Sequence, residues 1–203
     1  MQFLHCLAVL FAGLIVAAVF TRVVYAFAPR ITYAPWLDIF VSLFTWVPWV
    51  AGAWLCGWPG VGAALLAQWV FLNLFCLADR LVRGKPGPTL SHAHAKKLGR
   101  VRNELALLLT TPAVVVFFLV RFSEIVFYPP MARMARMPAY KSSEWINLSR
   151  HKFDGLVGHD LVWCWYCDWM TGVWALGSEM LRNVESFWCP IRFCDECKNR
   201  NVS

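Results

Sequence analysis

The sequence predicts an all-α integral membrane protein with about four transmembrane helices and a small Cys/Trp-rich helical domain at the membrane surface. The first observation is composition: of 203 residues, 59% are hydrophobic and only 15% are charged, whereas a soluble domain carries about 25% charged residues. The second is a series of four long apolar runs. The third is that five of the eight cysteines lie in the last forty residues, and that residues 142–203 hold six tryptophans.

The four apolar runs are the predicted membrane spans. They cover residues 3–20, 36–56, 61–78 and 105–128. A span needs about 20 mostly apolar residues, within a range of roughly 17–25, and the first three runs meet this length. The fourth reaches it only by including Arg121 and Glu124. We expect these two side chains to extend toward the membrane interface, where their charges remain in water.

Local sequence signals predict the nature of the first span and of the turn between the second and third. The run at 3–20 has no basic segment before it and exceeds the usual length of about 7–15 residues for the apolar part of a signal peptide. We therefore expect an uncleaved first span. Residues 57–60, Gly-Trp-Pro-Gly, leave room only for a tight turn between the second and third helices.

The basic residues predict the orientation in the membrane. The connection at 79–104, the predicted basic loop, holds seven lysines and arginines between positions 80 and 102. The positive-inside rule places this loop in the cytoplasm. Four more basic residues favour the same side, Arg121 near the end of the fourth run and Arg133, Arg136 and Lys141 after it. Since a fourth span would carry them to the other side, the side of the C-terminal tail stays open.

The character of the chain changes near residue 129, which divides it into a transmembrane region at 1–128 and a membrane-associated tail at 129–203. Residues 131–137 read as a short basic segment on the bilayer surface. Tryptophan favours the boundary between water and lipid, where its ring is buried and its N–H stays hydrated. The tail is therefore predicted to be a mostly helical domain pressed against the membrane.

The tail cysteines form two C-x2-C pairs, which is the pattern that brings four thiolates around one metal ion or an iron–sulfur cluster. The predicted ligands are Cys164, Cys167, Cys194 and Cys197, with Cys189 or His159 as substitutes. Zinc and iron, the latter mononuclear or in an iron–sulfur cluster, both suit such a site. Disulfides, a thiol redox pair or simple packing are the alternatives, and for Cys6, Cys56 and Cys76 packing inside apolar runs is favoured.

The local conformation around Cys164 and Cys167 has two interpretations. A metal-binding knuckle normally has a small residue beside its second cysteine, but Asp168 occupies that place. A continuous helix from Asp160 instead places Asp160, Cys164, Cys167 and Thr171 on one face. The second interpretation predicts an interfacial helix that presents sulfur and carboxylate groups together.

Several function classes lack their signatures in the sequence. The basic residues flank membrane runs rather than forming a basic face on a soluble fold, so nucleic acid is not an expected partner. The third run holds Gln68 and Asn73 as its polar amides, without the ionisable groups typical of an ion-coupled transporter. No P-loop, G-x-S-x-G or H-E-x-x-H motif occurs.

These observations predict a membrane protein whose C-terminal cysteines bind a metal and serve electron transfer or redox support of a membrane complex. One alternative is a non-catalytic assembly subunit with a structural zinc site. A second alternative is a thiol–disulfide oxidoreductase that uses Cys164 and Cys167, so whether the protein is an enzyme stays open, and no catalytic residue is assigned. The expected partners are the lipid bilayer and other membrane protein subunits.

Overall fold

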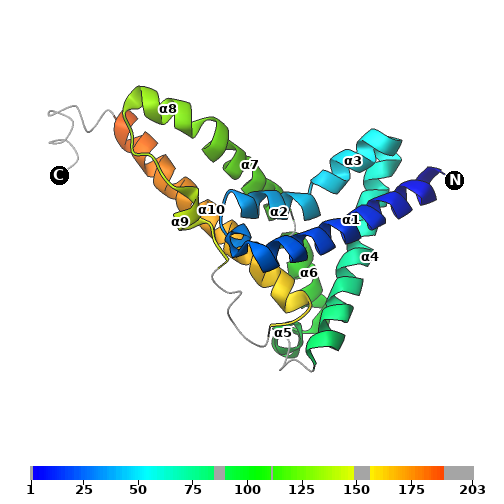
Figure 1. The fold of residues 1–203 in the computed structure, drawn as a ribbon. Helices are drawn as coiled ribbons and strands as arrows, with labels where there is room; N and C mark the ends of the chain where they lie inside the picture. Colours follow the sequence, from blue (N-terminus) through cyan, green and yellow to red (C-terminus); the bar gives the residue numbers. More distant parts are fainter. Residues whose placement is uncertain (1, 85–89, 111, 149–155, 190–203) are drawn as a thin grey trace.

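The computed structural model describes residues 2–84, 90–110, 112–148 and 156–189. This part of the chain is built from helices and turns, with no β-strand among the described residues, which confirms the prediction of an all-α protein (Figure 1). Tyr33 and Asn147 form an isolated antiparallel bridge between two connecting segments. That bridge ties the connection after the first helix to the region before the last one.

Three helices are long and apolar enough to cross a membrane. They are α1 (Gln2–Phe27), α4 (Trp58–Arg83) and the stretch Arg100–Val126, which consists of α6 (Arg100–Thr110) and α7 (Ala113–Val126) with Pro112 at the junction. Each is longer than the apolar run that predicted it. Most of their surface is exposed and apolar, as expected for side chains that face lipid.

The second predicted run, 36–56, is not one straight helix. It forms α2 (Trp36–Phe44) and α3 (Val47–Cys56), whose axes are bent by 46°. The protein therefore has three candidate membrane spans, or four if this bent pair of helices forms a single span. Pro48 lies in the first turn of α3, where a missing backbone N–H removes no helical hydrogen bond.

Gln68 of α4 occupies the bend between α2 and α3. Its Nε2 donates to the carbonyl oxygens of Phe44 at 2.8 Å and Thr45 at 2.6 Å, while Trp49 Nε1 donates to its Oε1 at 2.6 Å. A helix break in an apolar medium leaves carbonyl groups without partners, and each costs free energy. One amide side chain therefore satisfies the polar groups that the bend releases.

Replacing Gln68 with leucine should lower the stability of the bend, because one indole N–H and two carbonyl groups lose their partner. Leaving one buried polar group unpaired costs about 1–3 kcal/mol. We expect a clear fall in the thermal unfolding temperature of Gln68→Leu, measured by circular dichroism in detergent. Asn73→Leu is the control, because Asn73 donates only to Trp69 of its own helix on an exposed face. Equal losses in both variants would contradict this role of Gln68.

Helices α1, α3 and α4 form one packed unit. Gly57, with φ at +63°, makes the turn from α3 into α4. Gly52 and Gly60 then face one another so closely that a Cβ on either would collide with the carbonyl group of the other. Small residues of α4 continue this surface and pack with α1, at Ala63, Ala64, Ala67, Cys6, Leu10 and Leu14. Small side chains at helix interfaces are typical of membrane proteins because they allow backbones to approach.

A second unit, made of α2, α7 and two short helices, surrounds α10 (His159–Trp188), a single helix of 30 residues that lies along α7 (Figure 1). Its buried face, which includes Trp169, Val173 and Leu176, packs with Leu37 and Val41 of α2. Helices α8 (Tyr128–Ala135) and α9 (Ser142–Trp145) complete this core. The C-terminal helices thus share a core with α2, so the region after residue 129 packs directly onto helices that precede it.

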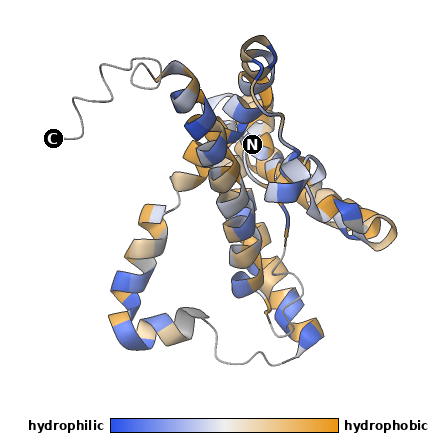
Figure 2. Cartoon of the chain, turned by 90° about the vertical axis from the view of Figure 1, so that its left-hand side faces the viewer, coloured by the Kyte–Doolittle hydropathy of each residue, from blue (hydrophilic) through white to orange (hydrophobic). Residues whose placement is uncertain are grey.

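The basic connection after α4 is largely helical rather than an irregular loop. It contains α5 (Leu90–Leu98), followed by Gly99 and the start of α6. Figure 2 shows hydrophilic residues gathered at the end of α4, on α5 and at the beginning of α6. Apart from Lys85, which lies outside the described residues, the lysines and arginines of this connection therefore lie at the end of α4, on α5 and at the start of α6.

Candidate functional site

The predicted metal ligands fall on or beyond α10. His159 is its first residue, Cys164 and Cys167 are half-buried within it, and Cys189 follows its last residue. Cys194 and Cys197 lie outside the described residues. Burial raises the pKa of Tyr166 to about 12, although its hydrogen bond with Thr45 acts in the opposite direction. The phenol between the two cysteines therefore stays neutral at physiological pH.

The unbroken length of α10 separates the two groups of predicted cysteine ligands. At 1.5 Å per residue, about 33 Å of helix lies between Cys167 and Cys189. Cys194 follows Cys189 by five residues, and five residues of fully extended chain span at most about 18 Å. Two cysteine side chains and an ion add only a few ångströms. Within one chain and with α10 intact, Cys194 therefore cannot share an ion with Cys167.

Within the described ranges, no group of three or more His, Cys, Asp or Glu side chains is placed to hold a metal ion. No disulfide joins any two of the six cysteines that the structure describes. Cys6 and Cys76 are each 1% exposed, and both contribute to helix packing.

A buried group of charges connects α2, α7 and α10. Arg121 of α7 donates from Nε at 3.1 Å and Nη2 at 2.7 Å to Asp38 Oδ2 of α2. Its Nη1 donates to Glu124 Oε2 at 2.8 Å. Trp169 of α10 donates from Nε1 to Asp38 Oδ1 at 2.9 Å. We call Asp38, Arg121 and Glu124 the charged cluster.

The charged cluster corrects the expectation that Arg121 and Glu124 extend to the membrane interface. Arg121 is 4% exposed and Glu124 is 5% exposed, so both point into the protein. Their spacing of three residues places them on the same face of α7, which is the face that packs on α10 and α2. The partner that holds them there is Asp38, and Trp169 fixes its second oxygen.

The sequence contained a usable signal for this site. Charged residues inside membrane runs are rare and usually pair with one another or mark functional positions. Asp38 is the one acid in the second apolar run, and Arg121 and Glu124 interrupt the fourth. Pairing charges between runs, rather than assigning each to the nearest interface, would have found the charged cluster.

Glycine allows α7 and α10 to approach beside Glu124. A Cβ at Gly177 would lie 2.9 Å from Glu124 Oε1 and 3.0 Å from Val120 Cγ1. Further along α10, Arg182 Nη2 lies 2.8 Å from Glu179 Oε2. The two residues are three positions apart on the helix, and the Arg182 side chain is mostly exposed.

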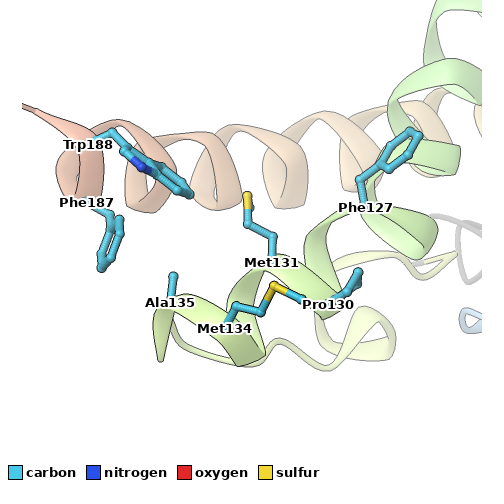
Figure 3. Close-up of a pocket in the computed structure, with 7 residues that line it drawn as sticks. All are labelled: Phe127, Pro130, Met131, Met134, Ala135, Phe187 and Trp188. Carbon is cyan, nitrogen blue, oxygen red and sulfur yellow. The ribbon is translucent and has the colours of Figure 1, made fainter.

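An apolar groove of about 460 Å³ lies between α8 and the end of α10 (Figure 3). Met131, Met134 and Trp188 extend into it from the two helices. Phe127, Pro130, Ala135 and Phe187 complete its lining. The groove therefore adjoins Cys189, the residue at which α10 ends.

No protein family, curated protein or solved structure matches this chain.

Proposed function

We propose that this protein is a non-catalytic membrane subunit that holds a metal ion through thiolates at the C-terminal end of α10 and supports the assembly of a membrane complex. The single observation that carries the proposal is the unbroken length of α10. Because this helix separates Cys167 from Cys189 by about 33 Å, we assign the cysteines to two separate sites. The set beginning at Cys189 is the better metal site, since its three cysteines lie within nine residues.

The packing of α10 supports an anchoring role. Trp169 is fully buried and bonded to Asp38, so the middle of the helix is attached to α2 and α7. The end that carries Cys189 adjoins the apolar groove on α8. Three thiolates would leave one position on a tetrahedral ion. A ligand from a partner subunit in that position would couple metal binding to assembly.

The thiol–disulfide alternative receives less support from the helix. A reactive cysteine gains thiolate character at a helix N-terminus or beside a cation, and the dipole effect fades beyond the first turn. Cys164 and Cys167 both lie beyond the first turn of α10. The electron-transfer role remains a prediction, and bound iron would be its signature.

Metal content of the purified full chain tests this proposal. We expect stoichiometric zinc in the unmodified protein, near-complete loss in Cys189→Ser, and retention in the matched variant Cys164→Ser. Iron with visible charge-transfer bands would favour electron transfer over structural support. Loss of metal from Cys164→Ser with retention in Cys189→Ser would contradict the assignment, as would a metal-free protein that contains disulfides.

A further inference from the structure

The charged cluster contains one cation and two carboxyl groups, and it leaves one carboxyl oxygen without a partner. Both oxygens of Asp38 accept hydrogen bonds, from Trp169 and from Arg121. Glu124 Oε2 accepts one from Arg121. Glu124 Oε1 is buried and has no hydrogen-bond partner in the part of the chain that the structure describes. With both carboxyl groups ionised, the cluster would carry a net negative charge away from water.

The surroundings of Glu124 Oε1 decide what this atom can bind. The charged groups that face the carboxyl group are Arg121 on its own helix and Asp38 on α2, whereas α10 contributes Gly177 beside Oε1. Calcium and magnesium require about six oxygen ligands, and a single free oxygen next to a guanidinium cannot supply them. A proton needs only one oxygen. A buried neutral carboxyl group also costs far less than a buried unpaired charge.

We propose that Glu124 is a buried proton-binding site, with its carboxyl group neutral and the proton on Oε1. Asp38 is the carboxyl group whose two oxygens are both satisfied, because they accept hydrogen bonds from three N–H donors, two of them on the guanidinium of Arg121. One proton makes the charged cluster neutral as a whole. Gly177, which packs beside Glu124, precedes Cys189 by twelve residues. The proton-binding site is therefore separate from the proposed metal site.

The packing around the proton also indicates how it would be exchanged. Gly177 of α10 and Val120 of α7 lie next to Oε1, so water reaches the proton only when the two helices separate. Uptake and release of this proton are therefore coupled to movement of α10 against α7.

Infrared spectroscopy of the full chain in lipid nanodiscs at neutral pH tests the proposal. We expect a carbonyl stretching band of a protonated carboxyl group that shifts in D2O, and its loss in Glu124→Gln. Glu179→Gln is the matched control and should keep the band, because Glu179 pairs with Arg182 near the surface. Absence of the band from the unmodified protein, or its persistence in Glu124→Gln, would overturn the assignment.

A second variant keeps the test decisive if Glu124→Gln fails to fold. In Asp38→Asn the only remaining counter-ion of Arg121 within the charged cluster is Glu124. Glu124 should then ionise, and the same band should disappear. A band that survives in Asp38→Asn would overturn the charge-balance argument and with it the proposal.

Discussion

Replacing Arg121 with methionine is expected to destabilise the protein by about 3–5 kcal/mol, because the substitution leaves buried carboxyl groups without their cation. Asp38 and Glu124 both pair with Arg121 and both lie within the packed interior. For a chain of this size, a loss of this magnitude lowers the thermal unfolding temperature by roughly 6–20 °C. Tryptophan fluorescence during heating in detergent measures the change, since Trp169 contacts Asp38.

A combined apolar replacement distinguishes the loss of a charge partner from the loss of packing. The triple variant Asp38→Leu, Arg121→Met and Glu124→Leu removes all three ionisable side chains together. Replacing a whole buried ion group with apolar residues is often neutral or stabilising, so the triple variant should unfold close to the unmodified protein. If it unfolds as early as Arg121→Met alone, the charges are not the cause.

Replacing Gly60 with alanine should produce the largest packing defect in the membrane helices. The added Cβ would collide with the carbonyl group of Gly52, and neither backbone can move without separating α3 from α4. Overpacking of this kind costs about 1–3 kcal/mol or more. We expect an earlier loss of helical signal on heating in detergent than for the unmodified chain.

Gly62 provides a control on the same helix, only two residues away. A Cβ at Gly62 would meet its nearest atom, Phe3 Cε2, at 4.0 Å, which is an ordinary contact. Because alanine favours helix over glycine by about 1 kcal/mol, Gly62→Ala should be neutral or stabilising. A similar loss in both variants would mean that the contact between Gly52 and Gly60 does not hold α3 and α4 together.

The sequence predicted the parts of the fold that depend on local composition. The apolar runs at 3–20 and 61–78 became α1 and α4, because twenty lipid-compatible residues in a row have few alternatives to a helix. The prediction of one continuous helix from Asp160 rested on the helical spacing of Asp160, Cys164 and Cys167, and the structure has this helix as α10. Glycine at positions 172 and 177 did not interrupt it.

The features that the sequence did not predict depend on partners far along the chain. The bend between α2 and α3 is tolerable because Gln68 satisfies its carbonyl groups, and hydropathy does not record that pairing. Arg121 and Glu124 were assigned to the interface because each charge was considered alone, whereas Asp38 lies 83 positions before Arg121. The distance along α10 from Cys167 to Cys189 likewise became clear only from the full extent of the helix.

The long sequence separations within the charged cluster have a consequence for biogenesis. Asp38 is synthesised 83 residues before Arg121 and 131 residues before Trp169. At about 5–20 residues per second, Asp38 is made roughly 4–17 s before its cation, and a carboxylate without a cation is costly to bury away from water. Contacts among α1, α3 and α4 are complete once residue 83 is made. That three-helix unit can therefore settle early, while α2 takes its final position only after the later helices emerge.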